Sequence, residues 1–163
     1  MQSKGRQTTA PTSVNVAVVR GPAGRGLSAL HIIDPAGASA DHYVPFRVRE
    51  VPASLGRDYA YAGLGAALDL LRALKTRNAV IATTEAAVVA EVNMQAEPLP
   101  GLTLAYITLG CKLNRLAESR LIAVPPQRLE PLRIKALARI PASWAAGRGL
   151  GRTCVSMPLV GLV

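Results

Sequence analysis

Glu85, in the segment TTEAAVV at residues 83–89, is a candidate catalytic residue by its type and position. It follows a short apolar run, residues 78–82, and precedes a run of alanine and valine. A glutamate at such a junction is usually a first-turn acid, which the positive end of a helix dipole favours. It can also be what is left of an active site. The choice depends on the residues at three other positions.

Positive charge is the second feature with a chemical meaning. The chain of 163 residues carries a net charge of +9. The segment from Lys112 to Arg152 contains nine basic residues and only two acidic ones. The electrostatic field of so many positive charges attracts polyanions. We therefore expect the last third of the chain to form a surface that binds nucleic acid. The alternative is that the excess only gives solubility. The candidates for phosphate contacts are Arg115, Arg120, Arg128, Arg133, Lys135, Arg139, Arg148 and Arg152.

The other reactive side chains form no evident site. Cys111 and Cys154 are the only cysteines, and without a CxxC motif or a secretory segment they indicate reduced thiols in a cytoplasmic protein. His31 and His42 have no nucleophile beside them. The segment GPAGRG lacks the lysine of a phosphate-binding loop, so it indicates a hairpin turn. Trp144 either stacks on a base or anchors the C-terminal segment.

Three strands are predicted before residue 50. Residues 14–19 and 27–33 are rich in valine, leucine and isoleucine, and residues 42–48 form a third apolar run. Pro45 interrupts the third run, which places that strand at a sheet edge or a bulge. Glycine-rich and proline-rich turns separate the runs, so we expect an antiparallel meander.

Helices and strands alternate in the rest of the chain. Leucine and alanine recur at helical spacing over residues 58–74. We then expect a strand at 78–83, a helix at 85–94, a strand at 102–109, a helix at 113–123 and a basic helix at 128–140. A meander followed by this alternation predicts an α/β fold with a five-stranded mixed sheet and helices on both faces. Because aromatic residues make up only 4% of the chain, the core must be aliphatic.

The two ends of the chain differ from the middle. Residues 1–12 are polar and predict a disordered tail, and residues 13–124 form the folded domain. Residues 125–163 make a basic helix and tail, whose apolar end CVSMPLVGLV could join a second copy or a protein partner. No apolar run is long enough for a transmembrane helix, so no membrane partner is expected.

Three local patterns follow one another in a familiar order. The segment VAVVRGPAGRGLSALHIIDPAG is a strand that ends at a glycine-rich turn into a second strand. YAYAGLGAALDLL is similar to the pattern AEYxALxxALxLL, and TTEAAVV is similar to TDSxxVV. About thirty residues on, NRLAESRLIA is similar to NxxADxLA. Over residues 14–123 the chain thus resembles the ribonuclease H-like superfamily, in particular its small single-domain members.

The resemblance implies a chemistry that needs metal ions. Members of the superfamily cleave the RNA strand of RNA/DNA hybrids with two divalent ions, Mg²⁺ or Mn²⁺, held about 4 Å apart. Four carboxylates, from the first strand, the first helix, the fourth strand and the last helix, clamp the two ions. On this chain those places fall at Arg20, Ala60, Glu85 and Glu118.

Two of the four implied acids are therefore missing. Mg²⁺ demands short, strict distances, and a guanidinium in the pocket would repel it. Asp58 is the one acid near enough to replace a ligand, although its position suits the start of a helix better. The sequence predicts a degenerate site that holds no metal cofactor; Glu85 and Glu118 would be the ligands if activity remains.

Arg20 permits two interpretations. Its guanidinium could donate paired hydrogen bonds to Glu85 and Glu118, forming a structural ion-pair network where the metals would lie. Alternatively, Arg20 points to solvent and each glutamate only favours the start of its helix.

The sequence thus predicts a catalytically inactive ribonuclease H-like protein, a pseudoenzyme, that binds RNA or an RNA/DNA hybrid. The first alternative is a working metal-dependent ribonuclease H with displaced ligands. The second is an assembly module that uses the sheet edge and the apolar C-terminal residues.

Overall fold

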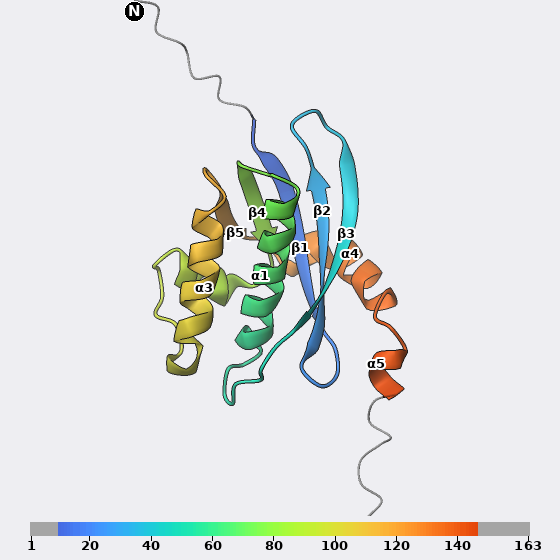
Figure 1. Cartoon of the computed structure of the whole chain (residues 1–163), viewed down its shortest axis with the longest axis vertical. Coiled ribbons are helices and arrows are strands. Elements are labelled where there is room, and N and C mark those ends of the chain that lie inside the picture. The colour runs from blue at the N-terminus through green and yellow to red at the C-terminus, as the bar shows by residue number, and fades with distance from the viewer. Residues whose placement is uncertain (1–9, 147–163) are drawn as a thin grey trace, which may run out of the picture.

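The computed structural model describes residues 10–146, and five strands in that range form one mixed sheet (Figure 1). The strands are β1 Thr12–Arg20, β2 Arg25–Ile33, β3 Ser39–Arg47, β4 Ala79–Thr83 and β5 Arg120–Ala123. The first three are antiparallel neighbours, and β4 and β5 pair in parallel beyond β1. The strand order is β3-β2-β1-β4-β5, which confirms the predicted meander and mixed sheet. Pro45 lies in β3, an edge strand, as its missing N–H requires.

The segment GPAGRG is the predicted hairpin turn between β1 and β2. The N–H of Gly21 donates to the carbonyl of Arg25 at 2.8 Å. Ala23 and Gly24 have φ values of 54° and 69°, the left-handed conformation that a tight two-residue turn needs at both central positions.

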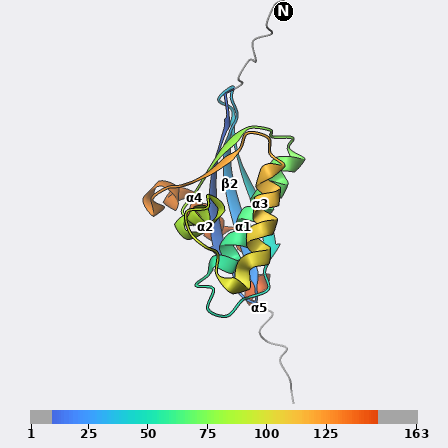
Figure 2. The ribbon, with the colours of Figure 1, turned by 90° about the vertical axis from the view of Figure 1, so that its left-hand side faces the viewer.

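Helices cover both faces of the sheet, as predicted (Figures 1 and 2). One face carries α1 Arg57–Ala73, α2 Ala86–Val92 and α3 Thr103–Asn114, with the 3-10 turn η1 Pro100–Leu102 leading into α3. The other face carries α4 Pro126–Ala138, followed by the short α5 Ser143–Ala146. Within residues 10–146, no helix is both long and apolar enough to cross a membrane.

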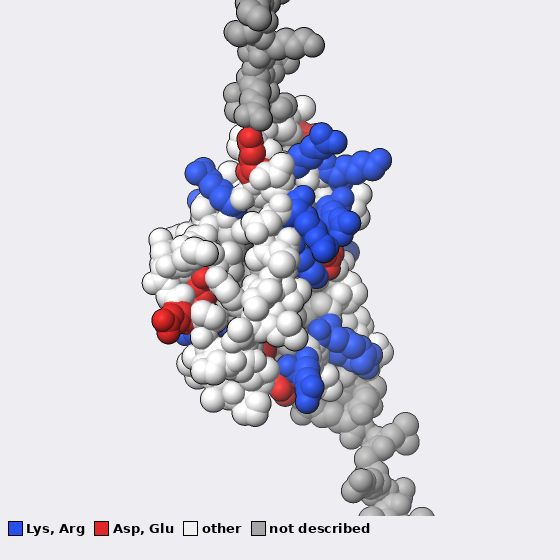
Figure 3. Space-filling model, turned by 60° about the vertical axis from the view of Figure 1, so that its left-hand side comes forward, with Lys and Arg blue, Asp and Glu red and all other residues white. Residues whose placement is uncertain are grey.

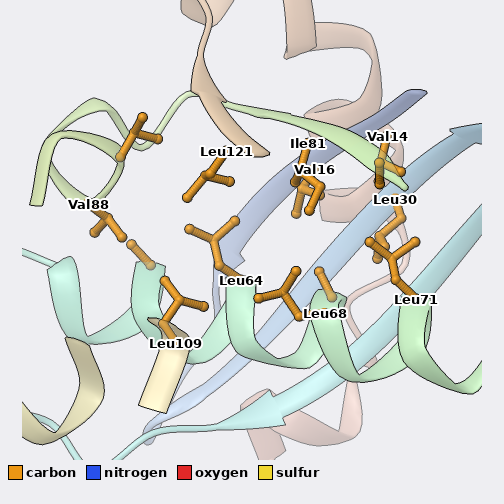
Figure 4. Packing of buried hydrophobic residues seen from close by; sticks show 14 of the residues in the cluster. Val14, Val16, Leu30, Leu64, Leu68, Leu71, Ile81, Val88, Leu109 and Leu121 are labelled. Atoms are coloured by element: carbon orange, nitrogen blue, oxygen red, sulfur yellow. The ribbon is translucent and has the colours of Figure 1, made fainter. Parts of the chain in front are cut away.

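The core is mainly aliphatic, with Tyr61 as one of its few aromatic members, and lies on both sides of β1. Val14 and Val16 are fully buried against α1, in a cluster that also holds Leu64 and Leu109 (Figure 4). Ala17 and Val19 of the same strand face the other way, toward α4. Because β1 is buried on both faces, apolar residues do not alternate with polar ones along it, and Asn15 is the single polar residue between Val14 and Val19.

Two elements predicted between residues 102 and 123 are wrong. The expected strand 102–109 is helical, because these residues form the end of η1 and most of α3. The segment LTLAYITL has residues that favour strands, but packing of Leu109 against the α1 side of the core decides its conformation. The expected helix 113–123 contains the end of α3 and then β5, a strand of four residues whose Leu121 is buried.

The folded unit has different boundaries from the predicted ones. Thr12 already belongs to β1, and residues 1–9 of the expected disordered tail lie outside the described part of the chain. The basic helix exists as α4, but it is part of the folded unit: Leu132 and Ala136 pack against Ala17 and Leu27 of the sheet. No break in packing therefore follows residue 124. Residues 147–163, with Arg148, Arg152 and the apolar C-terminal segment, lie outside the described residues.

Candidate nucleic-acid interface

A cleft of about 400 Å³ opens where β1 and β4 end. Val18 of β1 and Thr84, which directly follows β4, line one wall. The first turns of α4 form the opposite wall, with Glu130 and Arg133. Parallel strands bring their carboxyl ends to one edge, which is where α/β folds commonly hold ligands. We call this cavity the carboxyl-end cleft.

Arg20 does not bridge two glutamates in this cleft. Its guanidinium lies 3.4 Å from the carboxylate of Glu50 and 4.3 Å from the centre of the Tyr59 ring, and its side chain is exposed. The hydrogen bond with Tyr59, followed by the charge of Glu50, raises the pKa of Arg20. The ion-pair interpretation of Arg20 is therefore wrong, and the alternative describes its side chain, which faces solvent and stacks on an aromatic ring.

The predicted place of Glu118 is also wrong. Its backbone N–H donates to the carbonyl of Arg77 at 3.2 Å, so it lies just before β4 and β5 begin. Glu85 lies just after β4 ends, at the opposite ends of the strands. The misplacement follows from the predicted helix 113–123. The helix that does follow β5 is α4, and its only acid is Glu130.

Ala60 and Asp58 offer no ligand either. Ala60 is 1% exposed and packs in the α1 side of the core. The two carboxylate oxygens of Asp58 accept the backbone N–H groups of Val51 and Tyr59, each at 2.9 Å. Asp58 lies in the first turn of α1, as its position suggested, and it holds the connection from β3 in place.

A two-metal clamp does not fit these donors. β1 contains no acid, and among the described residues the acids at the carboxyl-end cleft are Glu130, which lines it, and Glu85, which follows the lining residue Thr84. Among the described residues, no group of three or more His, Cys, Asp or Glu side chains lies close enough to hold a metal ion. Two clamped ions need more carboxylate oxygens than two glutamates supply.

Glu85 is half-buried at the start of α2, and burial raises the pKa of its carboxyl group. Because the folded pKa lies above the unfolded one, folding disfavours the charged carboxylate. The resulting loss of folding free energy grows as pH rises and is complete once pH has passed the folded pKa. We expect Glu85→Gln to raise the melting temperature at pH 7. The gain should vanish at a pH below the ordinary range of glutamate. Thermal unfolding at both pH values tests this, and a gain of equal size at low pH would contradict it.

The predicted phosphate contacts on α4 are partly engaged within the protein. Arg133 pairs with Glu130 at 3.2 Å, Lys135 pairs with Asp41 at 2.9 Å, and Arg139 stacks on Tyr43. Hydrogen bonds from Lys135 and then from His31 lower the pKa of Asp41. Exposed ion pairs of this kind are weak, so a phosphate can still compete for these cations. Arg128 is exposed and forms no ion pair within the described residues.

A second basic surface forms at the opposite edge of the sheet, where β4 and β5 begin. It combines two of the predicted residues with three from the middle of the chain. All five are exposed, and none has an ion-pair partner within residues 10–146. We call it the amino-edge surface; its residues are Arg72, Lys75, Arg77, Arg115 and Arg120.

The fold explains why these five residues meet. Arg72 and Lys75 end α1, and Arg77 precedes β4. Arg120 begins β5, opposite Val80 of β4. The space-filling view shows lysine and arginine gathered toward the upper end of one face (Figure 3). Arg72, Lys75 and Arg77 were not among the predicted phosphate contacts, because they precede the charge-rich last third of the chain.

A buried charge was also missed. Glu91 of α2 is 1% exposed, and its carboxylate accepts hydrogen bonds from Arg57 and Tyr61 of α1. Burial, then the bond to Glu91, raises the pKa of Tyr61. A lone glutamate in the apolar helix AAVVAEV was the signal that could have found it, since buried acids need partners.

Three further predictions concern single residues. His31 is a sheet residue that pairs with Asp41 at 2.6 Å. Trp144 lies beside Gly21 and under the guanidinium of Arg25, at 5.9 Å, so it anchors α5. Cys111 is an exposed free thiol on α3, and Cys154 lies outside the described residues.

The element order, the strand order and the position of the cleft define a ribonuclease H-like fold. The chain is similar to ribonuclease H1 of the halophilic archaeon Halobacterium salinarum, with a TM-score of 0.63 and 15% identity over 80% of this chain and 100% of that one. It is also similar to the N-terminal ribonuclease H domain of a Mycobacterium tuberculosis protein, with a TM-score of 0.59 and 16% identity over 78% of this chain and 95% of that one.

A third similar structure is LC11 ribonuclease H1, isolated from compost by a metagenomic approach, with a TM-score of 0.60 and 13% identity over 85% of this chain and 98% of that one. The same LC11 protein has been solved in complex with an RNA/DNA hybrid, and that structure matches with a TM-score of 0.54 and 14% identity over 78% of this chain and 96% of that one. No family model and no curated protein matches the sequence. These likenesses confirm the predicted ribonuclease H-like fold.

Proposed function

We propose that this protein binds RNA or an RNA/DNA hybrid through its basic surfaces and does not cleave it. The observation that carries the proposal is the amino-edge surface, where five exposed cations from four separate segments converge without a carboxylate partner among the described residues. A structure of the same fold bound to an RNA/DNA hybrid supports the choice of polyanion.

Binding at this surface is electrostatic in kind. Arginine and lysine contact phosphate oxygens, and arginine can do so with two parallel hydrogen bonds. Contacts to phosphates position a protein on a strand but read no sequence. We therefore expect affinity that depends strongly on salt and weakly on base sequence.

The absence of cleavage is inferred from the carboxyl-end cleft. Val18 lines it near the end of β1, and the described residues of the cleft contribute the single acid Glu130. Glu85 follows the lining residue Thr84 and is the one other acid that could act there. The alternative of a working ribonuclease with displaced ligands would have to rest on these two glutamates.

The test is cleavage of an end-labelled RNA/DNA hybrid in the presence of Mg²⁺ or Mn²⁺. We expect the wild-type protein to shift the hybrid on a native gel and to leave it uncut. The variant Glu85→Gln/Glu130→Gln should behave like the wild type, as should the control Glu97→Gln, which changes an exposed acid outside the cleft. Cleavage that disappears only in the first variant would establish the ribonuclease instead. A hybrid that does not shift even at low salt would refute the binding proposal.

A further inference from the structure

A second cavity lies on the α1 side of the sheet and differs in chemistry from the carboxyl-end cleft and from both basic surfaces. It is open, with a volume of about 380 Å³, and lies between the β3–α1 connection, α1 and the η1–α3 segment. Its size is that of a small-molecule site. We call it the α1–α3 groove.

The groove exists because the facing helices present small side chains. Ala62 and Gly65 of α1 and Ala105 of α3 line it and leave the space between the helices unfilled. A Cβ on Gly65 would meet only the side chain of Lys112, at 3.5 Å, which shows that the room above this glycine is free of other atoms. Leu102 and Leu109 close the floor, and both are buried.

The wall on the solvent side is apolar as well. Leu104 lines the groove and is 77% exposed. Helix α3 carries a single charged residue, Lys112. A broad uncharged band runs down the middle of the space-filling view (Figure 3). Water in such a groove is displaced favourably by an apolar body.

The polar groups at the rim are cationic. Arg47 and Arg49 line the groove, are exposed, and have no ion-pair partner within residues 10–146. Lys112 pairs with Asp69 at 2.6 Å. The only acid in the lining, Asp58, has both oxygens engaged by backbone N–H groups. A ligand therefore meets apolar walls and two free guanidinium groups.

We propose that the α1–α3 groove binds a small amphipathic anion, with an aromatic or aliphatic body in the groove and one carboxylate or similar anionic group on Arg47 and Arg49. A nucleic-acid strand does not match this site, because its polar backbone would lie against the apolar walls. The α1–α3 groove shares no residue with the amino-edge surface or the carboxyl-end cleft, so binding in it is independent of the proposed function.

The probe is 4-phenylbutyrate, titrated into full-length protein labelled at its methyl groups and followed by NMR. We expect the methyl signals of Val51, Leu102 and Leu109 to shift together. The neutral analogue 4-phenylbutanol should bind about tenfold more weakly or worse, because it loses the charge-assisted hydrogen bonds. Arg47→Gln/Arg49→Gln should weaken phenylbutyrate to a similar degree.

Two controls make the result decisive. Arg72→Gln/Arg77→Gln removes the same charge far from the groove and should leave phenylbutyrate binding unchanged. Gly65→Leu should fill the groove and abolish binding of both probes while the protein still unfolds cooperatively. Equal affinity for acid and alcohol would overturn the proposal, as would equal losses in the two arginine pairs. Shifts confined to methyl groups outside the groove would overturn it too.

Discussion

Replacement of Glu91 by alanine is expected to lower the free energy of unfolding by about 3–5 kcal/mol, the cost of breaking a buried ion pair from one side. Glu91 is 1% exposed and accepts hydrogen bonds from Arg57 and Tyr61. Its removal leaves a guanidinium and a phenol without their acceptor beside the core. The pair joins α2 to α1, so the loss should loosen the helix that follows Glu85.

Urea unfolding of the variant against the wild type measures this loss. Glu97→Ala is the matched control, because Glu97 is exposed after the end of α2 and should cost little. The triple variant Glu91→Leu/Arg57→Leu/Tyr61→Phe should recover much of the stability, since apolar groups can replace a buried charge network. If Glu91→Ala cost no more than Glu97→Ala, the network would not hold α2 in place.

Neutralising the amino-edge surface is expected to remove most of the salt dependence of hybrid binding. The variant changes Arg72, Lys75, Arg77, Arg115 and Arg120 to glutamine. If each residue binds one phosphate, the slope of log affinity against log salt should fall by about 0.7–0.9 for each cation removed. The five residues are exposed, so the variant should fold normally. Fluorescence anisotropy with a labelled RNA/DNA hybrid, at several salt concentrations, gives both slopes.

A matched pair separates a local surface from a general effect of net charge. Arg77→Gln/Arg120→Gln and Arg47→Gln/Arg49→Gln each remove two exposed arginines. Only the first pair should reduce the slope by the expected amount. Equal reductions would show that binding follows net charge alone. An unchanged slope in the five-residue variant would move the interface to α4, where Arg128, Arg133 and Lys135 would then be tested.

The fold was largely predictable because its strongest signals are local. The helix of residues 58–74 has a clear helical period, and the first three strands are separated by turn residues. The segment 102–123 was not predictable in this way. LTLAYITL is apolar on all sides and shows no period, and RLIA is too short to show one, so packing on α1 and pairing with β4 decide their structure.

The candidate site was also only partly predictable from the sequence. The absence of an acid from the first strand is visible in the sequence, because no Asp or Glu lies between Val14 and Leu30. The position of Glu118 was not visible in the sequence, because it depended on whether residues 113–123 form a helix or a strand. The partners of Arg20 were equally hidden, since Glu50 comes from a connection of irregular structure.

By itself, the sequence determined the aliphatic core, the β1–β3 meander, the basic character and the shortage of metal-binding acids. These properties depend on residue types and on spacings of a few residues. Only the tertiary structure decided which charges meet. Parallel pairing of β4 with β5 sets their amino ends side by side, and so places Glu118 beside Arg77 and Arg120 opposite Val80, at the end of the strands that is remote from Glu85. Such neighbours are set by strand register between distant segments, which no local pattern encodes.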